Sequence, residues 1–408
     1  MDDPNVPPPM SQAQPSPVRG TQRIASVDAY RGFVMFLMLA EVLRIATTAK
    51  GFPGSSLWAL LTFHTSHVEW TGCSLHDLIQ PSFSFLVGVA LPFSIATRAA
   101  RGQSRGVMAL HACWRALVLV LLGVFLRSVG KAETNWTFED TLSQIGLGYQ
   151  FLFALGFAPK RWQWTALGVI LFGYWLAWAT WPVAPADYDF AKVGVSAEWM
   201  QQHGLHGFAA HWQKNANIGF AFDQWLGGHV RRAAAFNAGG YLTLSFIPTL
   251  GTMLLGLLAG GWLRDDSDRR EKLAKLAGAC IACFLLGVTL HMFGVCPIVK
   301  RIWTPSWTLF SAGWCFLLLG TFYIVMDLGG LKRWAFPLTV IGTNSIAAYC
   351  IAHLFHDFIN GSLKTHLGAG FFDFAGKALA PLMQGTAVLL IYWLILFWMY
   401  RRKIFLRI

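Results

Sequence analysis

The sequence has few charged residues for its length. Only 13% of its 408 residues are Asp, Glu, Lys or Arg, whereas 55% are hydrophobic and the mean hydropathy is +0.47. A soluble protein of this size needs far more charge to cover its surface, so this scarcity excludes an ordinary soluble domain. The 19 Trp and 32 Phe residues instead suit lipid-facing helices and aromatic belts at membrane interfaces.

Acidic residues are outnumbered, with 20 Asp and Glu against 32 Lys and Arg, which gives a formal net charge of +12. In a chain this apolar, we interpret the excess as loop charge that orients the protein in a bilayer. It is not the footprint of a nucleic acid, and no nucleic-acid partner is expected.

The seven cysteines are an odd number and lie mostly inside apolar stretches. Cys280 and Cys283 have the spacing of a redox or metal pair, but their neighbours are Ala, Gly and Leu, and we interpret them as packing residues. His353, His356 and Asp357 could in principle bind a metal ion. An interfacial or substrate-facing role is favoured, and no metal site is expected.

Hydrophobic stretches long enough to span a bilayer recur along the chain. We predict an all-α polytopic membrane protein with about ten transmembrane helices, near residues 29–48, 76–97, 108–128, 141–158, 164–182, 242–263, 273–294, 307–327, 335–356 and 380–400. Basic residues recur in every second linker, so the positive-inside rule places both termini in the cytoplasm. Lys300 and Arg301 break this pattern. We expect a multi-pass protein of a bacterial inner membrane.

Two segments differ from the apolar remainder. Residues 1–22 are rich in Pro and Gln, so we expect a disordered cytoplasmic tail. A signal peptide has a basic start followed by a short apolar core, and these residues do not show that pattern. Residues 23–408 form the transmembrane domain. Within it, residues 183–240 are a long polar insert that we expect on the extracytoplasmic side.

The stretch from His67 to Gly88 combines a loop histidine with the start of an apolar helix. Ser74 and Asp77 have the spacing of a helix capping box, which predicts a helix that starts near Leu75. His67 then lies just above the helix mouth, where an imidazole can accept a proton near neutral pH or attack an acyl group. The local pattern alone favours the alternative, a loop histidine at the membrane interface.

Several charged residues lie deep within predicted spans. Glu41 falls in the first span, and Arg115 and Arg127 fall in the third, with Arg115 about midway along it. Charges at such depth usually face a cavity, the bundle interior or each other. No acidic residue lies one turn from Arg115, so its partner comes from another helix or from a ligand anion.

Four motifs resemble those of the heparan-alpha-glucosaminide N-acetyltransferase-like transmembrane acyltransferases. They run in the same order from Arg23 to about Tyr349. They are RIASVDAYRG at 23–32; the pattern formed by His67, Trp70, Gly72, Asp77, Leu78 and Pro81; PIVKRIWTPS at 297–306; and IGTNSI at 341–346. The chain departs from the family pattern at Gln144, where the family has Arg, and at Glu41, near a family Asn.

The resemblance implies a polytopic helical fold and transfer of an acetyl group from cytosolic acetyl-CoA to an amino sugar or glycan on the extracytoplasmic side. It implies that His67 is the active histidine, either a general base or a transient acyl carrier. From their positions in the chain, Asp77 or Glu41 could orient the imidazole or stabilise its charge, and we assign Asp77 to the catalytic site. We assign donor binding to Arg115, Arg127, Lys300, Arg301 and Asn344, and acceptor binding to Trp70, Glu41 and His353.

Two other functions stay open at this point. Buried charges and an even number of spans also suit a solute transporter, although no inverted repeat is visible. A non-catalytic membrane protein of envelope assembly is the third hypothesis. The sequence does not name the acceptor, and it leaves a homodimer open.

Overall fold

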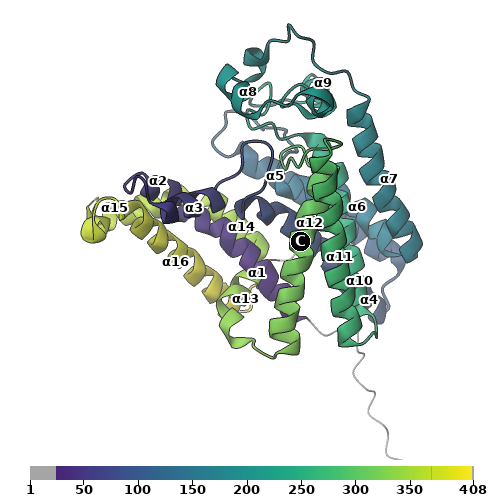
Figure 1. Cartoon of the computed structure of the whole chain (residues 1–408). Coiled ribbons are helices and arrows are strands. Elements are labelled where there is room, and N and C mark those ends of the chain that lie inside the picture. Colours follow the sequence, from purple (N-terminus) through teal and green to yellow (C-terminus); the bar gives the residue numbers. More distant parts are fainter. Residues whose placement is uncertain (1–23, 369, 407–408) are drawn as a thin grey trace, which may run out of the picture.

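The computed structural model describes residues 24–368 and 370–406, so the predicted tail at 1–22 lies outside the described residues. Within those ranges the regular elements are helices, apart from one isolated bridge between Thr71 and Val299. The helices of eight or more residues are α1 (Ala25–Leu39), α3 (Ser56–His64), α4 (Ile79–Ala100), α5 (Arg105–Ser128), α6 (Thr141–Gly156), α7 (Lys160–Ala179), α9 (Ile218–Gly227), α10 (Phe246–Arg264), α11 (Arg269–Met292), α12 (Pro305–Phe322), α13 (Phe336–Thr343), α14 (Ser345–Leu354), α15 (His356–Leu367) and α16 (Ala380–Arg401). The predicted all-α class is confirmed (Figure 1).

Six helical segments of the described chain are long and apolar enough to cross a membrane: α4, α5, α10, α11, α12 and α16, three of them with short helical extensions. The pair α13 and α14, bent by 67°, makes a seventh if it counts as one broken span. α6 has 16 residues and is about 24 Å long, shorter than a hydrocarbon core of about 30 Å. The count of ten spans and the cytoplasmic termini remain predictions.

The predicted first span at 29–48 is not one helix. α1 ends at Leu39, a 3₁₀ turn covers Ala40–Leu43, and Arg44 takes a left-handed backbone conformation with φ of 53° before the short α2 (Ile45–Ala49). α16 packs against this turn, where a Cβ on Gly385 would lie 2.1 Å from the carbonyl oxygen of Val42. The break places Glu41 on a turn rather than within a continuous helix.

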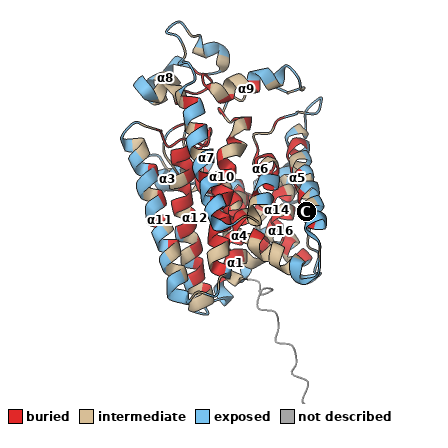
Figure 2. Ribbon diagram, turned by 90° about the vertical axis from the view of Figure 1, so that its right-hand side faces the viewer, coloured by how far each residue is buried: buried red, intermediate tan, exposed pale blue. Residues whose placement is uncertain are grey.

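The core is built around α4 and α10, which pack along each other. Their glycines permit the close approach: a Cβ on Gly88 would lie 1.9 Å from the carbonyl oxygen of Met253, and one on Gly256 would lie 2.0 Å from that of Phe85. α10 is therefore almost wholly buried, whereas α11 on the outside exposes much of its surface (Figure 2).

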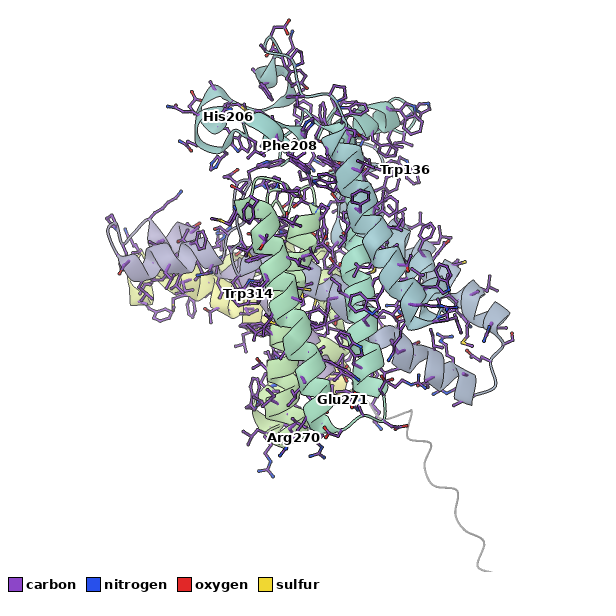
Figure 3. All side chains as sticks on the ribbon, turned by 45° about the vertical axis from the view of Figure 1, so that its right-hand side comes forward. Trp136, His206, Phe208, Arg270, Glu271 and Trp314 are labelled. Atoms are coloured by element: carbon purple, nitrogen blue, oxygen red, sulfur yellow. The ribbon has the colours of Figure 1, made fainter. Side chains whose placement is uncertain are left out.

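Residues 183–240 fold into short helical segments, among them α8 (Ala197–His203) and α9, which lie together above one end of the bundle (Figure 1). We call these residues the cap. Figure 3 places His206 and Phe208 in the cap, with Arg270 and Glu271 at the opposite end of the bundle. The indole Nε1 of Trp70 donates a hydrogen bond to the carbonyl oxygen of Trp212 at 3.2 Å, which ties the cap to the loop before α4.

Candidate active site

The loop that carries His67 is closed by the carboxylate of Asp77. The Asp77 Oδ2 atom accepts hydrogen bonds from the backbone N–H of Val68 and from the N–H and hydroxyl of Ser74, and the Ser74 Oγ accepts one from the Asp77 N–H at 3.3 Å. These reciprocal bonds are the predicted capping box. The first turn after it, His76–Leu78, is 3₁₀, and the α-helix follows from Ile79.

The second oxygen of the same carboxylate holds the imidazole. Nδ1 of His67 lies 2.8 Å from Oδ1 of Asp77, and the Lys300 ammonium lies 3.3 Å from that oxygen and 3.0 Å from Nδ1. Because the carboxylate only accepts, we assign the imidazole proton to Nδ1, donating to Asp77, with the Lys300 ammonium also donating to Asp77. Nε2 of His67 then keeps a free lone pair.

The surroundings of His67 favour its neutral form. Burial lowers the pKa of His67 below its usual value, and the nearby Lys300 ammonium lowers it further, whereas the hydrogen bond to Asp77 acts in the opposite direction. Lys300 and Asp77 are themselves almost fully buried, while 38% of the His67 side chain is exposed. The imidazole is therefore an accessible base supported by a buried ion pair.

Arg301, the neighbour of Lys300, fixes the loops around the histidine. Its guanidinium donates to the backbone carbonyl oxygens of Gly239 at 2.7 Å and Val68 at 3.2 Å, and it lies 3.6 Å from the carboxylate of Glu69. Lys300 and Arg301 are thus engaged within the protein, which gives a physical reason for their exception to the loop-charge pattern.

A cavity of about 1040 Å³ opens beside His67. Its walls come from the end of α1, the start of α4, the end of α5, the segment before α6, the end of the cap and the α14–α15 junction. The polar residues that line it are Glu41, Arg44, His67, His76, Gln80, Arg127, Lys131, Asn135, Thr137, Glu139, Asp140, Thr141, Arg232, Asn237, Tyr241, Lys300, Tyr349, His353, His356 and Asp357.

A second buried ion pair lines another wall of the cavity. The guanidinium of Arg232, in the cap, pairs with Glu139, and the amide of Asn237 donates to the other oxygen of that carboxylate. Burial raises the pKa of Glu139, and Arg232 opposes this rise. The pair joins the cap to the segment that leads into α6.

The predicted donor-binding residues separate into two groups. Lys300 and Arg127 line the cavity, and Arg127 is joined there by Arg44 and Lys131. In the part of the chain that the structure describes, none of Arg44, Arg127 and Lys131 has a carboxylate within ion-pair distance. They form a basic group that we call the cationic rim.

Arg115, Arg301 and Asn344 do not line the cavity. The Arg115 guanidinium lies over the ring of Tyr149 at 4.6 Å and donates to its hydroxyl at 3.2 Å. Asn344 is fully buried at the break between α13 and α14. The nitrogen and the oxygen of its side-chain amide each form a hydrogen bond with a backbone group near the C-terminus.

Of the predicted acceptor-binding residues, Glu41 and His353 line the cavity. His353 stacks on Tyr349 with ring centroids 4.3 Å apart. Trp70 is buried beneath the cap, where it anchors Trp212 and packs against Gly240, whose φ of +80° suits a glycine.

Sequence reasoning missed several cavity residues. His76 adjoins His67, with ring centroids 4.4 Å apart, and its Nε2 lies 3.1 Å from Oε1 of Glu41. Its position nine residues after His67 carried no signal, because the loop between them brings the two rings together. Arg232 and Asn237 lie in the polar insert, where the long separation from His67 hid their contribution. No three metal-binding side chains of the described residues are grouped to hold an ion.

Comparisons with known proteins agree with the motifs. No family model matches the chain. It is 23% identical to the heparan-alpha-glucosaminide N-acetyltransferase of Homo sapiens, over 95% of this chain and 60% of that protein. Identity to the enzyme of the same name from Mus musculus is 23%, over 80% of this chain and 53% of that protein. The chain thus spans less than two thirds of either relative. Over most of its length it is similar to the heparan-alpha-glucosaminide N-acetyltransferases, the family that its sequence motifs resemble.

Proposed function

We propose that this chain is a membrane-bound acetyltransferase that moves an acetyl group from acetyl-CoA to the amine of an amino sugar. The observation that carries the proposal is the imidazole of His67, oriented by Asp77 at 2.8 Å and facing a cavity of about 1040 Å³. A histidine whose Nδ1 donates to a buried carboxylate has its other nitrogen available as a base or nucleophile. The similarity to N-acetyltransferases supports this reaction class.

In the direct route, the acceptor nitrogen attacks the thioester carbonyl carbon and His67 Nε2 takes a proton from that nitrogen. The new C–N bond forms as the carbonyl π electrons move to oxygen, and the C–S bond then breaks with its electron pair on sulfur. In the covalent route, Nε2 first attacks the thioester carbonyl carbon, and the C–S bond breaks with its electron pair on sulfur to leave an acyl-imidazole. The acceptor nitrogen then attacks this acetyl group, the N–C bond to Nε2 breaks with its electron pair on Nε2, and Nε2 takes the proton from the acceptor nitrogen. Asp77 supports both routes, because its carboxylate stabilises the positive imidazole.

We propose that the cationic rim of Arg44, Arg127 and Lys131 holds the phosphates of acetyl-CoA. Cations without an internal counter-ion on a cavity wall suit a polyanionic ligand. Glu41 and His353 line the same cavity as His67, and the acceptor amine binds beside them in this proposal.

The membrane arrangement is part of the proposal. Ten spans with cytoplasmic termini would place the cap, His67 and the cationic rim on the extracytoplasmic side of a bacterial inner membrane, so in this proposal acetyl-CoA has to reach the rim from the cytosol. Reporter fusions after Arg105 and Arg270 are expected to report the cytoplasm, and a fusion after Gly54 the outside. An outside signal after Arg270 would contradict this arrangement.

The test uses the full chain in proteoliposomes with radiolabelled acetyl-CoA and glucosamine. His67→Ala is expected to lower acetyl transfer by about 10²- to 10⁴-fold, the contribution of a general base, and to leave acetyl-CoA binding intact. His64→Ala is the matched control, since His64 lies nearby but does not line the cavity. Wild-type transfer by His67→Ala would refute the assignment of the base.

The same label separates the two chemical routes. An acetyl group that stays on the wild-type protein after CoA leaves, and that is absent from His67→Ala, supports the acyl-imidazole. CoA release that depends on glucosamine, without labelled protein, supports direct transfer. Solute counterflow without any acetyl transfer would instead favour a transporter.

A further inference from the structure

The cavity contains a second imidazole–carboxylate pair beside the first. His76 lies on the 3₁₀ turn before α4 with only 8% of its side chain exposed, and its Nε2 is 3.1 Å from Oε1 of Glu41. Glu41 comes from the broken end of α1 and has 57% of its side chain exposed in the same cavity. The two pairs are adjacent, because the rings of His67 and His76 are 4.4 Å apart between centroids.

The two pairs differ in their counter-ions. The carboxylate of Asp77 is shared between His67 and the Lys300 ammonium, so its negative charge is already balanced. Among the residues that the structure describes, Glu41 has no Lys or Arg within ion-pair distance, and His76 is its ion-pair partner. The other titratable groups acting on Glu41 are His67 and, from α14, His353. A proton that reaches His76 is therefore balanced by a carboxylate of its own.

The reaction requires that a proton move between two heavy atoms. The amine nitrogen loses one proton, and the CoA sulfur, which leaves with the C–S electron pair, must gain one. A single histidine can do both only if it turns or if the sulfur comes to the same nitrogen. Two adjacent imidazoles remove that requirement, because one can receive the proton and the other can release it.

Resting on the proposed acetyl transfer, we propose that His76, with Glu41 as its counter-ion, carries the proton from His67 to the departing sulfur. The N–H proton of the acceptor passes to Nε2 of His67 as the C–N bond forms. It then passes to His76, directly or through one water, which makes a His76 imidazolium paired with Glu41. The imidazolium gives this proton to the thiolate, and both rings return to their neutral forms.

Changing the leaving group of the acetyl donor tests the role of His76. An aryl thiolate departs without protonation far more readily than the alkyl thiolate of CoA, because its conjugate thiol is more acidic. His76→Ala is therefore expected to lower kcat with acetyl-CoA by about 10- to 1000-fold, and by less than about threefold with S-phenyl thioacetate. His67→Ala is expected to lower kcat with both donors, because it acts on the amine.

Glu41→Gln provides a second variant that keeps the shape of the side chain and removes its charge. It is expected to show the same dependence on the donor as His76→Ala, with a smaller loss. Each variant is compared with wild type by thermal unfolding, so that a folding defect is recognised. His64→Ala, outside the cavity, is the control for both donors.

An equal loss with both donors would show that His76 only positions His67, and an unchanged kcat with acetyl-CoA would remove His76 from the reaction. Both outcomes overturn the relay while leaving the proposed function standing. A wild-type protein that transfers no acetyl group from either donor overturns the proposed function and the relay together.

Discussion

Arg232 and Glu139 form a buried ion pair on the cavity wall, with 7% and 10% of their side chains exposed. Next to it, Arg231 pairs with Glu133 at 3.1 Å, but these side chains are 81% and 63% exposed. Two consecutive arginines thus make the same kind of contact in opposite surroundings.

The first prediction uses this matched pair. Arg232→Met leaves Glu139 buried without its cation, so we expect it to destabilise the protein by about 3–5 kcal/mol. Arg231→Met is expected to cost less than about 1 kcal/mol, because the exposed pair is screened by water. Thermal unfolding of the purified protein in detergent gives both values. The double variant Arg232→Met with Glu139→Gln should recover part of the loss, and purely additive losses would contradict a coupled pair.

The second prediction concerns Lys300 and the pH dependence of activity. In the proposed reaction His67 acts in its neutral form. Burial and the Lys300 ammonium both lower its pKa, so activity is expected to persist below the usual pKa of histidine. Lys300→Met removes a neighbouring positive charge and leaves Asp77 unopposed. The pKa of His67 should then rise, and the acid limb of the pH profile of kcat/KM should move to higher pH.

Lys300→Arg keeps the positive charge and is the control for that shift. Its acid limb is expected to stay closer to that of wild type, whatever happens to its maximal rate. An acid limb that moves to lower pH in Lys300→Met would show that Lys300 does not act on His67 through its charge.

The sequence predicted the elements whose signals are local. The capping box of Ser74 and Asp77 required only their spacing, and the six long apolar helices required only hydropathy. The break after Leu39 had no comparable signal, since no Gly or Pro marks it in the sequence. The turn at this break packs closely against Gly385 of α16, which lies 343 residues after Val42 and so leaves no local signal.

The candidate site followed the same division. His67 and Lys300 were predicted because their motifs resemble those of a family, since the local pattern alone favoured an interfacial loop histidine. Asp77 was predicted from its place in the motif of His67. Nothing in the local sequence indicated that Lys300 would lie 3.0 Å from His67. Trp70 belongs to the same motif as His67, yet it lies beneath the cap rather than in the cavity wall, because a motif position does not specify which way a side chain points.

The third prediction tests the contact between α4 and α10. A Cβ on Gly260 would lie 2.3 Å from the carbonyl oxygen of Val89, whereas one on Gly261 would meet no atom within 4 Å. Gly260→Ala is therefore expected to force the helices apart and to destabilise the protein by about 1–3 kcal/mol. Gly261→Ala is expected to be neutral or slightly stabilising, because alanine favours helix. Equal melting temperatures for the two variants would contradict this packing.

The fourth prediction separates Asn344 from Arg127, both of which the sequence assigned to donor binding. The Asn344 amide donates to the carbonyl oxygen of Ile404 at 2.9 Å and accepts from the N–H of Leu406 at 3.1 Å. Both partners are backbone groups of exposed residues, so Asn344→Ala removes two hydrogen bonds made by a fully buried side chain, at a cost of about 0.5–1.5 kcal/mol for each. We expect a lower melting temperature and an unchanged KM for acetyl-CoA.

Arg127→Gln is expected to behave in the opposite way. Arg127 is exposed on the cationic rim of the cavity, so its loss should raise the KM for acetyl-CoA and leave the melting temperature unchanged. The rise should be smaller in high salt, because salt already screens the attraction between this guanidinium and phosphate. Donor affinity and thermal unfolding measured on both variants distinguish a donor-binding residue from a structural one. A raised KM in Asn344→Ala, without a lower melting temperature, would show that Asn344 binds the donor.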